Sequence, residues 1–126
     1  MKTFLILIAL SLSATCFAQK DTITTANAKD FMGKEVVVLG KVVSLKLATN
    51  GKSTNFINLD KPYPESVFTI VIFNNYLENL NLKLADLKGK MIYVKGTITT
   101  YKNDPKQIPE ILNPVSIAIK TDEWLL

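Results

Sequence analysis

The side chains that could do chemistry in this chain are lysines, tyrosines and a few dispersed carboxylates. All 15 basic residues among its 126 are lysines, because the sequence contains no arginine and no histidine. Without histidine, no imidazole can act as an acid or base near neutral pH or bind a metal. Cys16 is the only cysteine, and no serine has a lysine at a spacing that marks a nucleophile. We therefore expect a protein that is not an enzyme.

The carboxylates form no evident catalytic pair or metal site. Asp60, Glu65, Asp104 and Glu110 are scattered over segments with loop composition. A magnesium or calcium site needs several acidic or carbonyl ligands close together, and the sequence has no such run. We expect these four residues to be solvated turn residues, and we expect neither a cofactor nor a metal.

Lysines beside aromatic residues are instead typical of a surface that binds a polyanion. Lysines can follow the phosphates of a single-stranded nucleic acid while aromatic rings stack on its bases. The formal net charge of +4 is mild, and lysine-rich surfaces also keep proteins soluble. The charge alone therefore leaves two hypotheses open. The partner is single-stranded nucleic acid or another polyanion, or it is a protein or glycan.

Runs of β-branched residues predict the elements that must position these side chains. Residues 35–47 read as a long first strand, in which Gly40 indicates a bulge or bend. The apolar spacing predicts a helix over 74–87, with Asn81 as a point where it can split. A short helix is expected just before Gly33. The other predicted strands are 54–59, 67–73, 90–101 and 106–112, with a last short piece at 116–119.

The order of these elements is three strands, a helix and two strands. This order predicts an all-β fold, namely a five-stranded Greek-key OB-fold barrel with the short helix between strands three and four. The alternative is a β-sandwich, which needs about seven strands. We expect the barrel to cover residues 33–119, preceded by an extension at 19–32 that carries a short helix and followed by a tail at 120–126.

The N-terminus has the composition of a secretory signal peptide. A basic start is followed by the apolar run 4–12 and by small residues at Cys16 and Ala18. We expect residues 1–18 to be removed, so that the protein is exported to the periplasm or secreted. An alternative is a lipoprotein acylated at Cys16. No second run is long enough to cross a bilayer, so we expect no membrane span in the mature chain.

Several local strings resemble the OB-fold nucleic-acid-binding family, in particular its small exported bacterial members. Gly33-Lys34 and Gly89-Lys90 each precede a strand that holds a further glycine, as in anticodon-binding-like OB domains. The string 105–108, Pro-Lys-Gln-Ile, before the last barrel strand is similar too. The resemblance covers about 33–119. It implies an OB barrel that binds single-stranded DNA, RNA, oligosaccharides or other proteins.

In OB folds, oligomers bind across strands two and three, between the loops that join strands one to two and four to five. Alternation places Ile57 and Leu59 inward and leaves Phe56 and Asn58 outward. On the fourth strand it places Ile92, Val94 and Ile98 inward, and the residues between them outward. The predicted ligand-binding residues are Lys46, Lys52, Phe56, Asn58, Lys61, Tyr63, Lys95, Tyr101, Lys102 and Lys106.

Overall fold

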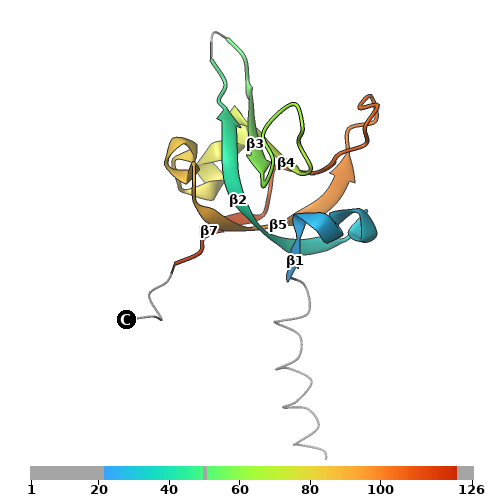
Figure 1. Cartoon of the computed structure of the whole chain (residues 1–126). Coiled ribbons are helices and arrows are strands. Elements are labelled where there is room, and N and C mark those ends of the chain that lie inside the picture. Colours follow the sequence, from blue (N-terminus) through green and yellow to red (C-terminus); the bar gives the residue numbers. More distant parts are fainter. Residues whose placement is uncertain (1–21, 50, 122–126) are drawn as a thin grey trace, which may run out of the picture.

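The computed structural model describes residues 22–49 and 51–121, which form a strongly curved sheet with short helical turns (Figure 1). The described part contains seven strands and three 3₁₀ helices. In chain order these are β1 (Thr22–Thr24), η1 (Thr25–Phe31), β2 (Glu35–Lys46), β3 (Thr54–Leu59), β4 (Thr69–Phe73), η2 (Asn74–Leu80), η3 (Leu84–Leu87), β5 (Met91–Thr100), β6 (Pro109–Leu112) and β7 (Ser116–Ile119).

The strand pairings form a ring, because the long strand β2 pairs on both of its sides. Its first part, 35–41, is antiparallel to β5, and its last part, 42–46, is antiparallel to β3. The ring continues from β3 to β4, from β4 to β6 in parallel, and from β6 back to β5. The five strands of this ring follow one another along the chain in the order that the sequence predicted.

A bulge in β2 lets this one strand serve both halves of the ring. Val42 pairs with Leu59, but Ser44 already pairs with Asn58, so β2 holds one extra residue between them. The sequence placed the bend at Gly40, which instead lies against β3. A Cβ atom at Gly40 would lie 3.0 Å from Leu59 Cδ1. Gly40 therefore permits close packing of β2 against Leu59. The bulge itself lies further along β2, between Val42 and Ser44.

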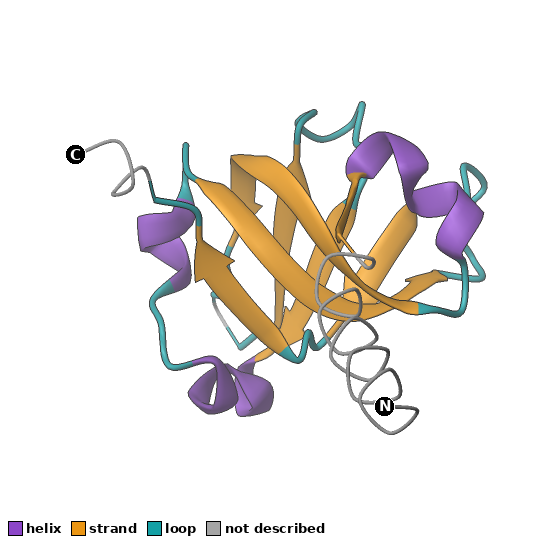
Figure 2. Cartoon of the chain, turned by 90° about the horizontal axis from the view of Figure 1, so that it is seen from below, coloured by secondary structure: helices purple, strands orange, loops and turns teal. Residues whose placement is uncertain are grey.

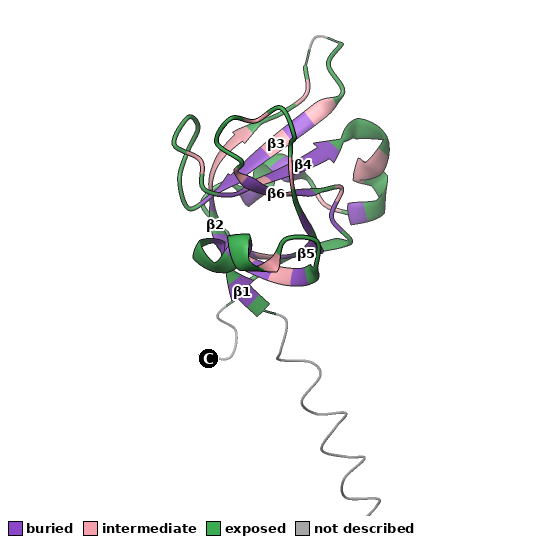
Figure 3. Ribbon diagram, turned by 90° about the vertical axis from the view of Figure 1, so that its right-hand side faces the viewer, coloured by how far each residue is buried: buried purple, intermediate pink, exposed green. Residues whose placement is uncertain are grey.

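The core fills the interior of the ring with side chains that are aliphatic apart from Phe68. The residues that supply them are coloured as buried along the ribbon in Figure 3. Ile57, Leu59, Ile92 and Val94 are fully buried, as the alternation predicted. The helical turns η1 and η2–η3 lie on opposite sides of the strands (Figure 2). Each contributes buried residues to the same core cluster: Ala28 from η1, Leu80 from η2, and Leu84 and Leu87 from η3.

The strand count differs from the sequence prediction, since there are seven strands and not five. β1 pairs in parallel with β2, inside the segment expected to be an extension of the barrel, and β7 pairs with β5. The segment 74–87 is two 3₁₀ turns rather than one helix, because Asn81 adopts a left-handed backbone conformation with φ of 53°. The expected short helix before Gly33 is present as η1.

Some sequence predictions lie outside the described residues. The signal peptide 1–18, Cys16 and the last five residues of the tail belong to this group. Across 22–49 and 51–121, no helix is long and apolar enough to cross a membrane. In the same ranges, no group of three or more carboxylate, cysteine or histidine side chains could hold a metal ion.

Candidate ligand-binding face

The outer face of β3, β4 and β6 carries an apolar row that runs across the strands. Phe56 on β3 pairs with Val71 on β4, and Val71 pairs with Leu112 on β6. Lys46 on β2 is the register partner of Phe56 on its other side. Register partners on one face lie close enough for their side chains to touch. The apolar row, Phe56, Val71 and Leu112, therefore begins beside the ammonium group of Lys46.

A second, polar row lies next to the apolar row, and Asn58 is at its centre. The Nδ2 atom of Asn58 donates to Ser44 Oγ (2.9 Å), while its Oδ1 atom accepts from Ser66 Oγ (3.1 Å) and Thr69 Oγ1 (3.0 Å). Asn58 is only 6% exposed. The sequence correctly aimed Asn58 away from the core, but the prediction that it is accessible to a ligand is wrong. Its amide instead ties the β3–β4 loop, through Ser66, to the sheet.

Glu110 continues the polar row, since it pairs with Thr69 on β4 and Thr99 on β5. Its partial burial, and secondarily the negative charge of Asp104, raise the pKa of the Glu110 carboxyl. Asp104 behaves in the opposite way. The amides of Ile108 and Lys106 donate to its carboxylate, both at 2.9 Å, and lower its pKa. Asp104 therefore organises the β5–β6 loop, and Glu110 introduces an acidic group into the face.

Five of the predicted lysines lie exposed at the ends and loops around this face. They are Lys46, Lys52, Lys61, Lys102 and Lys106. In the part of the chain that the structure describes, the one ion pair joins Lys95 to Glu35, so none of these five is within ion-pair distance of a carboxylate. Two tyrosines accompany them, with 80% of Tyr63 and 57% of Tyr101 exposed.

The β3–β4 and β5–β6 loops meet beside the face. Lys106 Nζ in the second loop donates to the backbone oxygen of Pro64 in the first, at 3.2 Å. This contact brings Lys106 close to the segment that carries Lys61 and Tyr63. Lys52 lies on the separate β2–β3 loop, which projects at the top of Figure 1.

Lys95 does not belong with the other predicted residues. It pairs with Val37 of β2 and Ser116 of β7, on strands that do not include β3, β4 or β6. Its Nζ atom lies 3.8 Å from Glu35 Oε1. Alternation predicted correctly that Lys95 points outward, but a strand that is shared between two halves of a curved sheet has outward residues on two different surfaces.

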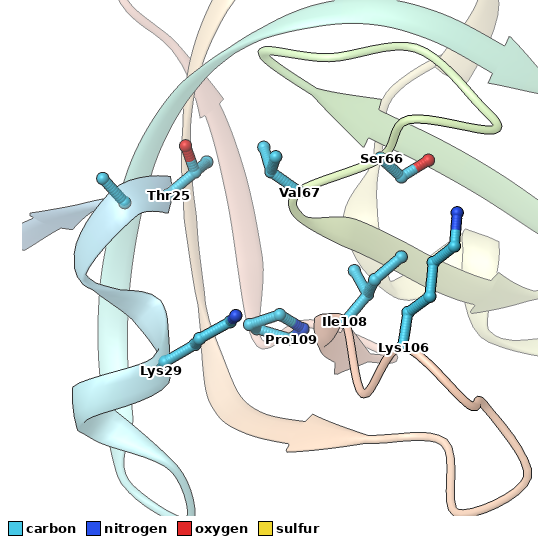
Figure 4. A pocket seen from close by; sticks show the side chains of 8 residues that line it. Thr25, Lys29, Ser66, Val67, Lys106, Ile108 and Pro109 are labelled. Atoms are coloured by element: carbon cyan, nitrogen blue, oxygen red, sulfur yellow. The ribbon is translucent and has the colours of Figure 1, made fainter.

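A depression between η1 and the two meeting loops was not predicted. It has a volume of about 380 Å³, and Figure 4 shows the side chains that line it. Of the predicted residues it contains only Lys106. The others are Thr25, Ala26, Lys29, Ser66, Val67, Ile108 and Pro109. Their sequence positions gave no signal, because η1 and the two loops become neighbours only through the tertiary fold.

Comparison with solved structures assigns the architecture. OBody AM1L10 bound to hen egg-white lysozyme matches with a TM-score of 0.55 and 21% identity, over 82% of this chain and 96% of that one. Yeast Stn1 and Ten1 match with a TM-score of 0.57 and 14% identity, over 84% and 65%. These neighbours are OB-fold proteins. This chain has an OB fold.

A third OB-fold neighbour is a putative aspartyl-tRNA synthetase from Leishmania major Friedlin. It has a TM-score of 0.51 and 11% identity, over 80% of this chain and 21% of that one. The chain therefore corresponds to only about a fifth of the synthetase. No protein-family model and no curated protein matches this sequence. At these identities the likeness establishes the fold alone.

Proposed function

We propose that this OB-fold protein is an exported, non-enzymatic binding module for single-stranded nucleic acid or another polyanion. The ligand lies across β3 and β4, and the barrel that carries it is the five-stranded Greek-key ring of OB type. The observation that supports this most directly is the set of five exposed lysines around the face. None of them forms an ion pair with a carboxylate of the described residues, and the exposed side chains of Tyr63 and Tyr101 accompany them.

The apolar row and the lysines would act on different parts of a strand. Phe56 is half-buried and held by its pairing with Val71, so its ring is a fixed surface on which a base can stack. Stacking accepts any base, because every base has a π face. Lys46 beside Phe56, together with the loop lysines, would contact the phosphates on either side. Asn58 has no part in this mechanism, because it is buried and its amide already bonds Ser44, Ser66 and Thr69.

The experiment is to measure the affinity of the purified protein for a short oligothymidine over a salt series. Phe56→Ala should weaken binding by roughly 1–3 kcal/mol at every salt concentration, because it removes a stacking surface and no charge. Lys52→Ala and Lys102→Ala should each flatten the slope of log affinity against log salt by about 0.7, because each removes one phosphate contact.

Lys83→Ala is the matched control, since Lys83 is an exposed lysine between η2 and η3, away from the face. It changes the net charge equally but should leave the slope unchanged. The proposal fails if the wild-type protein shows no salt-dependent binding. It fails equally if the variants at Phe56 and Lys52 bind as the wild type does.

A protein or glycan partner is the second candidate, and exposed apolar groups on the face favour a protein. Leu112 is 47% exposed and Phe73 is 38% exposed on the neighbouring strand β4, while the acidic Glu110 lies between the lysines. One of the structurally similar OB-fold proteins is bound to a protein, lysozyme. Leu112→Lys discriminates between the two, because added positive charge should strengthen oligothymidine binding and weaken docking of an apolar partner surface.

Export is the remaining part of the proposal, and it rests on the composition of residues 1–18. Cleavage after Ala18 leaves a chain that begins at Gln19. The intact mass of the protein recovered from a bacterial host that expresses the full chain tests this directly. A chain that keeps Met1 contradicts export by this signal, and a chain that begins with an acylated Cys16 identifies a lipoprotein.

A further inference from the structure

The depression between η1 and the two meeting loops has the features of a second binding site, which shares Lys106 with the lysines around the face of β3 and β4 but is otherwise lined by different residues. Val67, Ile108 and Pro109 supply most of its apolar lining. Lys29 reaches over it from η1, and Lys106 stands on the opposite side beside Ser66 (Figure 4). A site of about 380 Å³ is within the range that holds a small organic ligand.

The charged side chains that line this depression are both lysines, and no carboxylate lines it. The hydroxyls of Thr25 and Ser66, which also line it, already donate to Asp60 and Asn58. Neither Lys29 nor Lys106 forms an ion pair within the described residues. The nearby carboxylates have other partners. Asp60 accepts hydrogen bonds from the hydroxyl of Thr25 and the amide of Lys41, and Asp104 accepts from two loop amides.

The two lysines are not equivalent. Lys106 Nζ donates to the backbone oxygen of Pro64 and lies close enough to Asp104 to influence its pKa. Lys29 has no hydrogen-bond partner or ion-pair partner for its Nζ atom among the described residues. A ligand anion would therefore gain most from Lys29, with Lys106 as the second cation.

We propose that this depression binds a small phosphomonoester with a compact organic body, of the size of a nucleoside monophosphate. A phosphomonoester carries a charge of about −1.5 to −2 at neutral pH and three acceptor oxygens, so its charge balances that of the two lysines while its oxygens accept hydrogen bonds from Lys29. A carboxylate offers a single charge. The apolar side chains of Val67, Ile108 and Pro109 would contact the organic body. This inference goes beyond the proposed function, since it involves η1 and none of the apolar row.

The test is an amide NMR titration of the purified protein with uridine monophosphate, with uridine and inorganic phosphate as separate probes. Uridine monophosphate should shift the amides of Ala26, Ser66 and Val67 saturably, and uridine should not. Lys29→Ala should weaken this binding by about tenfold or more, as expected for the loss of a hydrogen bond to a charged group. Lys106→Ala should have a smaller effect.

Two further variants make the result specific. Ala26→Glu places a carboxylate at an exposed lining position and should abolish the shifts, while Lys83→Ala should leave them unchanged. Thermal melting of each variant establishes that it is folded. The proposal is overturned if uridine binds as tightly as its monophosphate, if the shifts fall elsewhere, or if Lys29→Ala and Lys83→Ala weaken binding equally.

The source of the phosphate is decided by two oligonucleotides that differ only in a terminal phosphate. If only the phosphorylated strand shifts the three amides, and does so more strongly than free uridine monophosphate, the site holds strand ends. If uridine monophosphate binds alone and neither strand does, the ligand is a free phosphate ester. The second outcome supports this site even if the proposed strand binding across β3 and β4 fails.

Discussion

Replacing Asn58 by alanine should destabilise the protein without removing a ligand contact. The amide of Asn58 joins three elements, since it bonds Ser44 on β2, Ser66 in the β3–β4 loop and Thr69 on β4. With 6% of its surface exposed, it is one of three buried polar residues among those described. Its replacement by alanine removes all three hydrogen bonds at once.

The magnitude follows from those three bonds. Each neutral hydrogen bond contributes about 0.5–1.5 kcal/mol to stability. The three hydroxyl partners are only partly buried, so water can satisfy part of what they lose. We therefore expect Asn58→Ala to lower the free energy of unfolding by about 2–3 kcal/mol. A domain of this size has roughly 5–15 kcal/mol, so the variant should remain folded.

Urea denaturation at constant temperature measures this change through the midpoint of the transition. Ser66→Ala is the matched control, because it removes only the bond that holds the loop and should cost about 1 kcal/mol. Hydrogen exchange should become faster in both variants at Glu65, whose amide donates to Pro62 within this loop. If the free energy of unfolding of Asn58→Ala lies within about 0.5 kcal/mol of the wild-type value, the amide does not hold the loop. Asn58 would then return to the set of candidate ligand contacts.

Three further predictions concern single positions. Gly96→Ala should cost about 1–3 kcal/mol in urea denaturation, because its Cβ would lie 2.5 Å from Ile111 Cγ2; wild-type stability would mean that β6 can shift. Glu110→Gln should stabilise the protein at neutral pH, because the folded state raises the pKa of this carboxyl above its ordinary 4.5 and ionisation is then unfavourable. That gain should disappear in melts recorded well below pH 4.5, and a gain that persists there would point to a different cause. Asp60→Ala should speed hydrogen exchange along η1, because it removes the acceptor of the Thr25 hydroxyl; unchanged exchange would show that packing alone holds η1.

The main strands could be predicted because their β-branched runs are unambiguous. β3 has the predicted bounds, β2 is one residue shorter than predicted at its C-terminal end, and β5 is one residue shorter at each end. The inward positions Ile57, Leu59, Ile92 and Val94 follow from simple alternation and are all fully buried. Where burial of one face is the main constraint, the period of the hydrophobic pattern and the residue composition are sufficient to predict a strand and its inward side chains.

Elements that depend on distant partners could not be predicted in the same way. β1 is three residues long and forms only because β2 offers a parallel partner. The segment 74–87 has a helical pattern, yet the left-handed Asn81 separates η2 from η3 so that Leu80 and Leu84 both reach the core. Here the tertiary fit overrides the local pattern.

The sequence predicted which way the side chains of the candidate site point, but it did not predict which of them are buried by neighbouring residues. Alternation aimed Phe56, Asn58 and Lys95 outward, and all three do point away from the core. It could not show that Ser66 and Thr69 bury Asn58, or that Lys95 lies beside β7. Both depend on how loops and neighbouring strands fold over a strand, and the sequence of that strand does not contain this information.

The bulge in β2 explains how one strand builds both the core and the edge of the face. Before the bulge, the inward residues are Val36, Val38 and Val42, all at even positions. Strict alternation would continue with Ser44 and Lys46 pointing inward, which would place an ammonium group in an aliphatic core at a high free-energy cost. The extra residue reverses the sides, so that Lys46 emerges next to Phe56. The charge that borders the apolar row is therefore fixed by the same irregularity that lets β2 pair with both β5 and β3.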